Sequence, residues 1–443
     1  MNSQLPNNVE KYLQKYSYDK WKIYKGNKKF ESVIVIPAID EYDNIKTLLS
    51  SLGQNEIEYF PTTLILFVVN HLTSSNVNVK QNNMKTIEYL KNIIDKKSSE
   101  DEFSKRIVKS NLQIGLIDAS SERLELEEKD GGVGLARKIG MDKALKIFDY
   151  DTSAKKILIC LDADCTVSEN YISTIRRAFD KNNINAGYVN FTHGRTDDVE
   201  NDKAIINYEL FLRYYVLGLK YANSPYAFHS IGSTMVCDVE SYMKIQGMNK
   251  RKAAEDFYFM EKLSKITDII KIEGVTVFPS SRGSWRVPFG TGKRVTRFLE
   301  KTQNEYLLYA PESFFVLKNW MEIFHSDEIL SAEEYLDHAE KINKSLFDFL
   351  IANKFKENWD NILNNSKSSN QINKQKQIWF DGFKTLKLIH FLRDSEFQLI
   401  NMFDALDELF KLMKIQFEYK NTKGEIPQLP IQEKYLNKLR EIA

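Results

Sequence analysis

The chain has 443 residues, enough for about two or three domains of ordinary size. Its 62 Lys and Arg residues nearly balance its 61 Asp and Glu residues, and the net charge of +1 argues against a protein that wraps nucleic acid. The cysteine count of 3, odd and low, indicates a reducing compartment and no disulfide framework. No apolar run approaches the ~18–20 residues that span a bilayer. The N-terminal residues lack the apolar stretch of a secretory signal, so none is expected. We therefore expect a cytoplasmic protein, with peripheral contact at the inner membrane face left open.

Strand and helix patterns alternate along the first part of the chain. Residues 1–30 are expected to form a helical or irregular lead-in. Short apolar runs then predict buried strands, and amphipathic stretches predict helices between them. The strands are expected at 32–36, 64–70, 113–118 and 156–161, and the helices at 43–52, 85–95 and 134–148. This alternation predicts an α/β fold with an open, mostly parallel, Rossmann-type sheet, whose ligands bind at the carboxyl ends of the strands.

The rest of the chain carries other patterns. Residues 186–297 show short strands, aromatic stretches and loops, whereas 298–443 is expected to be a helical appendage. Within it, Ser331 to Glu334 is a capping-box signature, and apolar residues from Tyr335 to Leu350 form a helical stripe. The polar stretch 364–377 is expected to be a linker or long loop, and 403–413 an amphipathic helix. The expected division is a lead-in at 1–30, a main domain at 31–297 and a mainly helical region at 298–443.

The strongest chemical signal is Asp162-Ala163-Asp164, directly after a buried strand. Hard cations such as Mg²⁺ and Mn²⁺ prefer oxygen ligands. A cation held by these carboxylates would neutralise a diphosphate and stabilise it as a leaving group. The alternative is a strand-end turn whose Asp residues cap the next helix. The preceding strand favours the metal–phosphate interpretation.

Two loops could contact an anionic or nucleotide ligand. The turn after the first strand contains Pro37, Ala38, Asp40 and Glu41; its alternative interpretation is a plain helix start with an acidic cap. The Gly-rich segment 131–134 leads into a helix, where backbone N–H groups can approach an anion. Arg137 on that helix would add positive charge. It is neither a Walker A loop nor a G-x-G-x-x-G fingerprint, and a flexible loop is the alternative.

Two further segments carry charged side chains suited to catalysis. Glu255 and Asp256 stand at an expected helix start. They could simply interact favourably with the helix dipole. Alternatively, Asp256 could be a general base for an acceptor hydroxyl. Residues 282–294, which include Arg286 and Lys293, have the composition of an anion-binding loop that closes over a ligand. A solvated basic loop is the alternative interpretation.

The order of these segments resembles the family 2 glycosyltransferases of the GT-A fold. The matching segments are the opening at 33–41, Gly134 to Gly140, the D-x-D at 162–164, and the acceptor segment from Gly247 to Asp256. The resemblance covers roughly residues 31–297, which would then be a GT-A catalytic domain. It implies a nucleotide-diphosphate sugar as donor, Mn²⁺ or Mg²⁺ as cofactor and an acceptor hydroxyl that is not identified.

The resemblance also implies residue roles. Asp256 would match the catalytic base of inverting members, with Glu255 beside it. Asp162 and Asp164 would hold ribose and metal. Together with the loop chemistry above, the donor site is expected to use Pro37, Ala38, Asp40, Glu41, Asn70, Gly134, Arg137, Asp162, Asp164, Arg286 and Lys293.

Some features depart from the family pattern. The usual Tyr-Asn of the opening is Ile39-Asp40, and an Asp after the second strand is replaced by Asn70-His71. The Q-x-x-R-W motif of processive synthases is absent, as are membrane spans, so single-sugar transfer is expected rather than polymer extrusion. Two alternatives stay open: a nucleotidyltransferase of similar architecture, and a GT-A-like binding module without turnover.

Overall fold

The computed structural model describes residues 5–25, 28–97, 101–283 and 290–443, which form two compact units. Unit 1 contains the described residues up to Arg195 together with Ser230–Ser281, and unit 2 contains Thr196–His229 and Thr291–Ala443. This division differs from the expected boundaries, because residues 196–229 group with the helical end of the chain. None of the helices described combines the length and the apolar character needed to cross a membrane.

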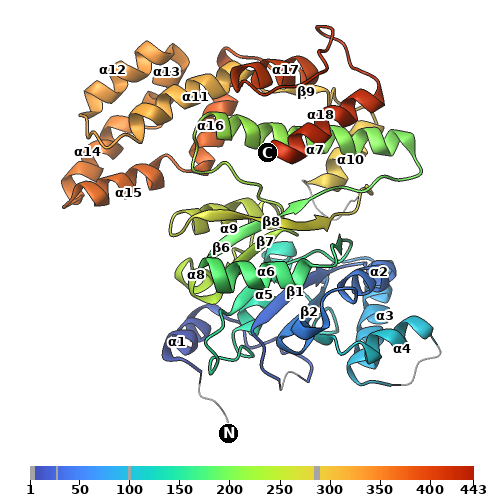
Figure 1. Cartoon of the computed structure of the whole chain (residues 1–443). Helices are drawn as coiled ribbons and strands as arrows, with labels where there is room; N and C mark the ends of the chain where they lie inside the picture. Colours follow the sequence, from blue (N-terminus) through green and yellow to red (C-terminus); the bar gives the residue numbers. More distant parts are fainter. Residues whose placement is uncertain (1–4, 26–27, 98–100, 284–289) are drawn as a thin grey trace. The chain divides into compact units, whose positions relative to one another are not determined.

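Unit 1 is built on an eight-stranded mixed sheet with the order β3-β2-β1-β4-β7-β6-β8-β5 (Figure 1). β1 pairs in parallel with β2 and β4, β2 with β3, and β6 with β8, whereas the remaining pairs are antiparallel. The expected α/β class with a mixed, mostly parallel sheet is thus confirmed. The strands are β1 Ser32–Ala38, β2 Thr63–Asn70, β3 Gln113–Ala119, β4 Ile157–Cys160, β5 Thr166–Val167, β6 Ala186–Phe191, β7 Met235–Asp238 and β8 Ile269–Phe278.

Helices cover both faces of this sheet. They are α1 Asn7–Tyr16, α2 Tyr42–Leu52, α3 Val77–Ile94, α4 Glu102–Lys109, α5 Val133–Ala144, α6 Tyr171–Asn182, α8 Val239–Lys244 and α9 Glu255–Ser264, with a 3₁₀ turn at Ile57–Thr62. Side chains alternate between the faces of a strand. Ile34 and Ile36 of β1 therefore join one buried cluster with α2, α3 and α6, while Val35 points to the other face. There Gly140 of α5 lies against Val35 and Val68, so that helix and sheet approach closely.

Gly140→Ala should destabilise unit 1 because that approach leaves no room for a methyl group. An added Cβ would lie 2.4 Å from Val35 Cγ1 and 2.9 Å from Val68 Cγ2. Overpacking of this kind costs about 1–3 kcal/mol. Urea unfolding measures the loss. Gly194→Ala is the matched control, because nothing lies within 4 Å of its Cβ position; equal effects of the two changes would contradict the expectation.

Unit 2 is helical around one large aromatic-rich core, which includes Trp320, Phe324 and Trp359. Its helices are α7 Val199–Tyr221, α10 Thr291–Leu299, α11 Pro311–Phe324, α12 Ala332–Ile342, α13 Lys344–Ala352, α14 Phe355–Asn365, α15 Ser369–Trp379, α16 Gly382–Ser395, α17 Met402–Leu412 and α18 Leu429–Ile442 (Figure 1). Two short antiparallel strands, β9 Leu307–Leu308 and β10 Ile400–Asn401, form a sheet of their own. The predicted capping box is confirmed at α12, where Ser331 and Glu334 cap each other's backbone.

The longest helix, α7, was not expected from the sequence, which indicated strands and loops in this region. Most of its residues are buried, so apolar side chains do not fall on a single stripe. Its buried polar residues interrupt the apolar pattern further. Glu209 and Arg213 pair one turn apart at 2.9 Å, and Glu209 also accepts from Arg440 of α18, so both charges are buried inside unit 2. Without a one-sided pattern, periodicity could not identify the helix.

Two other expectations for unit 2 were wrong. The predicted loop at 364–377 contains helix α15, which begins with the Ser368 side chain accepting from Gln371 N–H. Its Gln and Lys residues favour helix although they bury little apolar surface. The stripe from Tyr335 to Leu350 belongs to two helices, because Asn343 has extended dihedral angles and caps the start of α13.

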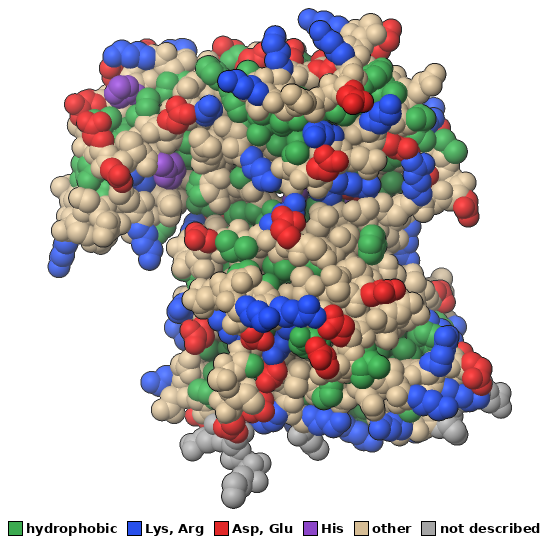
Figure 2. Space-filling view, in the orientation of Figure 1, with side chains coloured by type: hydrophobic (Ala, Val, Ile, Leu, Met, Phe, Trp, Pro, Cys, Tyr) green, Lys and Arg blue, Asp and Glu red, His purple; other side chains and the backbone are tan. Residues whose placement is uncertain are grey.

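Charges are mixed over the face of the molecule drawn in Figure 2. In the face drawn in Figure 2, acidic and basic side chains occur side by side over both units. This agrees with the net charge of +1.

Candidate active site

The strand order reverses between β1 and β4. From β1 the chain proceeds outward through β2 to β3, and it then returns to β4 on the other side of β1. In open α/β sheets, ligands bind outside the carboxyl ends of the strands at such a switch point. Pro37 and Ala38 end β1, Asn70 ends β2, and Asp162 follows β4. The predicted residues of these strand ends are therefore brought to one edge of the sheet.

Asn83 of α3 connects the ends of β1 and β2. Its Oδ1 accepts from the backbone N–H of Asp40 at 3.0 Å, and its Nδ2 donates to the backbone oxygen of Asn70 at 2.9 Å. The Nδ2 also lies 3.1 Å from Nδ1 of His71, whose pKa is lowered by burial. Asn70 Nδ2 in turn donates to the backbone oxygen of Ala38 at 3.4 Å. The two loops are thus fixed to each other by buried amides.

Asn83 was missed by sequence reasoning because the expected helix began too late, at residue 85. α3 begins at Val77 with an Asn76 side-chain cap, and this cap was the signal that could have extended it. Asp40 has a positive φ of 57°, which fits the sharp turn between β1 and α2. Glu41 precedes α2, is buried, and accepts from Asn44 Nδ2.

A buried arginine joins the two acidic motifs. Arg137 of α5 has a side chain only 2% exposed, and its Nη2 donates to Asp162 Oδ1 at 2.5 Å while its Nη1 donates to Glu255 Oε1. The Asp162 side chain is 36% exposed and that of Glu255 is 6% exposed. We call Arg137, Asp162, Glu255 and Asp256 the Arg137 cluster. The D-x-D turn and the start of α9 are therefore held together by one guanidinium.

Two glycines allow the chain to close around this cluster. A Cβ on Gly232 would lie 2.3 Å from an Arg137 nitrogen, so the backbone at Gly232 lies directly against the guanidinium. A Cβ on Gly134 would lie 2.5 Å from the backbone oxygen of Arg251, which precedes α9. Gly134 is thus needed for close packing of the α5 start against the segment before α9. This packing gives a structural reason for a glycine at position 134, which the sequence analysis had considered as an anion-binding position.

Asp256 is partly exposed, and its Oδ1 accepts from the Phe257 backbone N–H at 2.7 Å. Burial, and after it the adjacent Glu255 carboxylate, raise the pKa of Asp256 to about 7, against the opposing effect of Arg137. This pKa lies well above the ~4 that is ordinary for a carboxyl group. A carboxylate that titrates near neutral pH is well matched to general base catalysis.

Arg137→Met should strongly destabilise unit 1, because it leaves Glu255 buried without a counter-ion. Removing one member of a buried ion pair costs about 3–5 kcal/mol, and the partial exposure of Asp162 places the expected loss at the lower end. Urea unfolding at neutral pH measures it. Arg177→Met is the control, since Arg177 pairs with Glu56 on the surface and should change stability little. A loss no larger than in this control would contradict the structural importance of the guanidinium.

The D-x-D carboxylates fit a divalent cation by their chemistry. Asp162 and Asp164 follow a buried strand, and both remain partly exposed. Among the described residues, no group of three or more His, Cys, Asp or Glu side chains has the arrangement of a complete metal site. Mg²⁺ is often held by one or two carboxylates together with substrate phosphates. A cation here would accordingly need the ligand's own oxygens.

Two predicted donor-binding residues remain, Arg286 and Lys293. Arg286 lies outside the described residues. Lys293 is exposed on α10 in unit 2, whereas the Arg137 cluster belongs to unit 1. His193 is buried and packs edge-on against Phe191. The three cysteines are buried and unpaired with one another, as expected for a chain without disulfides.

Comparison with known proteins gives matches only among solved structures. No protein-family model matches the sequence, and no curated protein matches it. The chain is structurally similar to GT-A glycosyltransferases across most of its length.

Three of these structures illustrate the similarity. S. aureus TarS is 11% identical, with a TM-score of 0.33 over 72% of this chain and 54% of TarS, so the chain spans about half of that protein. TarS 1–349 in complex with UDP is 11% identical, with a TM-score of 0.37 over 89% of this chain and 99% of that one. The mannosyltransferase PcManGT from Pyrobaculum calidifontis, in complex with GDP-Man and Mn²⁺, is 13% identical, with a TM-score of 0.35 over 88% of this chain and 93% of that one. At such low scores, the candidate site rests on the chain's own geometry.

Proposed function

We propose that this chain is a glycosyltransferase that moves a single sugar from a nucleotide-diphosphate sugar to an acceptor hydroxyl, with a divalent cation as cofactor. The observation that carries the proposal is the buried Arg137, which joins the D-x-D turn to the Glu255-Asp256 helix start at the switch point of the sheet. Sugar transfer needs both functions in one place: stabilisation of a departing diphosphate and a base for the incoming hydroxyl. On this proposal, unit 1 is the catalytic domain and unit 2 is a helical appendage.

The donor half of the proposed site lies along the ends of β1, β2 and β4. The loops fixed by Asn83 would hold the nucleoside, and Asp162 would bind ribose while Arg137 keeps its carboxylate in place. Asp164 would hold Mn²⁺ or Mg²⁺ together with the diphosphate oxygens. When bound, such a cation supplies positive charge that offsets the charge of the leaving diphosphate.

The acceptor half would use Asp256. In one displacement, the acceptor oxygen bonds to the anomeric carbon, the bond from that carbon to the diphosphate oxygen breaks, and the acceptor proton passes to an Asp256 carboxylate oxygen. A single displacement inverts the anomeric configuration. Glu255, held by Arg137, would position the start of α9 and so orient Asp256.

Turnover should depend on pH through Asp256. Its pKa is raised to about 7, and a general base acts only when deprotonated. The value of kcat should therefore be low below about pH 7 and should rise as the pH increases through 7. The charged groups that act on Asp256 are Glu255, Arg137 and Asp162. Measurement of kcat from about pH 5.5 to 8.5 at saturating substrate gives the ES-complex pKa. A profile that is flat across this range, with chemistry rate-limiting, would contradict the assignment of Asp256 as the base.

The proposal is tested with the purified full-length chain and a panel of UDP- and GDP-sugars, with and without Mn²⁺. A true donor should raise the melting temperature in a metal-dependent manner, because a bound ligand stabilises by RT ln(1 + [L]/Kd). Slow hydrolysis to the nucleoside diphosphate should accompany binding. Release of pyrophosphate from nucleoside triphosphates would instead identify a nucleotidyltransferase, and binding without any product would identify a non-catalytic module.

A further inference from the structure

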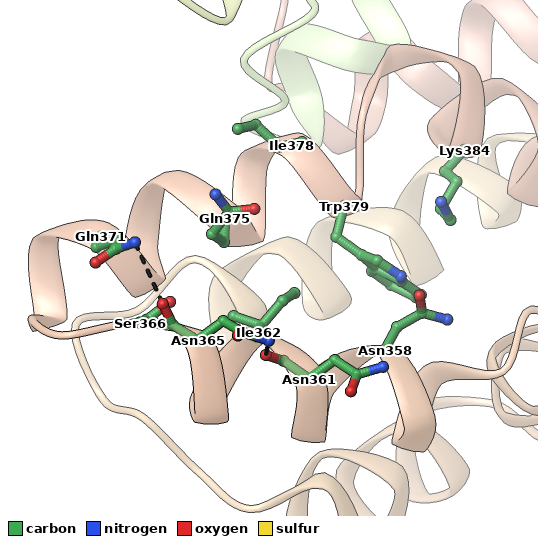
Figure 3. A pocket seen from close by; sticks show the side chains of 10 residues that line it. All are labelled: Asn358, Asn361, Ile362, Asn365, Ser366, Gln371, Gln375, Ile378, Trp379 and Lys384. Carbon is green, nitrogen blue, oxygen red and sulfur yellow. Dashed lines mark hydrogen bonds between the residues drawn. The ribbon is translucent and has the colours of Figure 1, made fainter.

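A concave site lies wholly within unit 2, apart from the residues assigned to catalysis. α14, α15 and α16 line an open cavity of about 420 Å³, within the range of small-ligand pockets. Figure 3 shows its lining: Asn358, Asn361 and Asn365 from α14 face Gln371 and Gln375 from α15, and the ring of Trp379 stands at one end. Five of the ten lining residues are carboxamides, and the others are Ile362, Ser366, Ile378, Trp379 and Lys384.

The sequence of this region is unusual for a helical surface. Residues 361–380 contain no Asp or Glu, and the cavity lining contains no carboxylate. α15 buries only Lys376, so its polar residues are not explained by packing into the core. α15 contacts the core through the partly buried Ile372 and Trp379, and its remaining amides line a hollow, a composition that suits a binding surface.

Several amide groups remain available to a ligand. Within the part of the chain that the structure describes, the side chains of Asn361 and Gln375 make no hydrogen bond, so each offers both donors and an acceptor. Asn358 Nδ2 donates to the Lys354 backbone oxygen at 2.7 Å, and Asn365 Nδ2 donates to the Asn361 backbone oxygen at 2.8 Å, which leaves their Oδ1 atoms as acceptors. The lining thus presents donors and acceptors together, without net negative charge.

We propose that this cavity binds a short neutral saccharide. Each sugar hydroxyl both donates and accepts, which complements the paired donor and acceptor of a carboxamide. The electron-rich face of an indole attracts the weakly positive C–H groups on the flat side of a pyranose. The partly exposed Trp379 supplies such a surface. Its ring also packs edge-on against Phe355 and Phe324 and tilted against Phe380, and the Lys384 ammonium lies over it at 4.7 Å.

A peptide partner fits less well. Peptide and protein interfaces depend on large apolar or Arg anchors in desolvated pockets, whereas half of the residues that line this cavity are amides and Trp379 is the one aromatic residue among them. The saccharide proposal goes beyond the proposed transferase activity. It does not require that activity, because its residues lie in unit 2 and the Arg137 cluster lies in unit 1.

The test uses the full-length chain without nucleotide or metal and saturation-transfer NMR with methyl β-D-glucopyranoside, methyl N-acetyl-β-D-glucosaminide and their β-1,4-linked disaccharides. At least one pyranoside should bind saturably, with the strongest transfer to its ring C–H protons. Mannitol, which has hydroxyls but no pyranose face, should not bind. The absence of binding by every saccharide, or equal binding of mannitol, would overturn the proposal.

Matched variants locate the site. Asn361→Ala/Gln375→Ala should weaken binding about tenfold or more, since it removes two side chains that can hydrogen-bond the sugar. Asn364→Ala/Gln377→Ala, which removes two exposed amides of the same helices outside the cavity, should leave binding unchanged. Equal affinities of the two double variants would overturn the proposal. Binding of peptides from a mixture that no saccharide displaces would overturn it as well.

The same variants separate this proposal from the transferase proposal. Asp164→Asn should keep saccharide binding in unit 2, whereas Asn361→Ala/Gln375→Ala should keep metal-dependent hydrolysis of the nucleotide-sugar. Trp379→Phe retains an aromatic ring beside Phe355 and should weaken binding severalfold without loss of the fold, as checked by circular dichroism. Unchanged binding in this variant would show that the indole does not contact the sugar, and it would overturn the proposed stacking of the pyranose on Trp379.

Discussion

Asp256→Asn should lower turnover by about 10²–10⁴-fold, the usual effect of removing a general base. The amide keeps the size of the side chain but cannot take up the acceptor proton. Donor affinity should stay nearly unchanged, because the strand-end loops and Asp164 are untouched. Single-turnover kinetics with a donor and acceptor pair measures the chemical step, and titration of the donor by thermal shift measures its binding separately.

Asp268→Asn is a suitable control for this variant, since Asp268 follows the end of α9 and is exposed. Its turnover should match that of the unmodified chain. The residual activity of Asp256→Asn should also lack the inflection near pH 7 that Asp256 gives to the unmodified chain. Loss of donor binding with turnover preserved at saturation would instead move Asp256 to the donor site.

Asp164→Asn should abolish metal-dependent transfer. A neutral amide is a poorer ligand for a hard cation than a carboxylate, so Mn²⁺ should no longer stabilise the bound diphosphate. The fold should survive, because Asp164 is partly exposed and does not contact the Arg137 guanidinium that holds Asp162 and Glu255. Loss of the Mn²⁺-dependent thermal shift with an unchanged melting temperature of the free protein is the expected measurement.

Asp151→Asn provides the matched control, an exposed Asp in the turn before β4. It should retain both the thermal shift and the transfer activity. If nucleotide binding remains dependent on metal in Asp164→Asn, the cation is held elsewhere and the D-x-D assignment is wrong.

The expected strands of unit 1 correspond closely to the observed ones. β1, β2 and β4 are short apolar runs that are buried along nearly their whole length, whereas β3, at the edge of the sheet, is buried mainly at its centre. β1, β2, β3 and β4 begin and end within about two residues of the expected positions. The D-x-D turn could also be placed from sequence, since two carboxylates directly after such a run must stand at the carboxyl edge of the sheet. Helix α7 could not, because it is buried on nearly all sides and its polar residues pair inside the unit.

What the sequence by itself determined was local: the strands, the D-x-D turn, the capping box and the acidic pair at the start of α9. Only the tertiary structure decided how these segments meet. Arg137 was expected to face a ligand, but its guanidinium is buried between Asp162 and Glu255, which are 25 and 118 residues away along the chain. Pairings at such separations leave no periodic trace in sequence, because they depend on which helix lies over which strand. The raised pKa of Asp256 has the same origin, since it comes from burial and from neighbours that only the folded chain brings together.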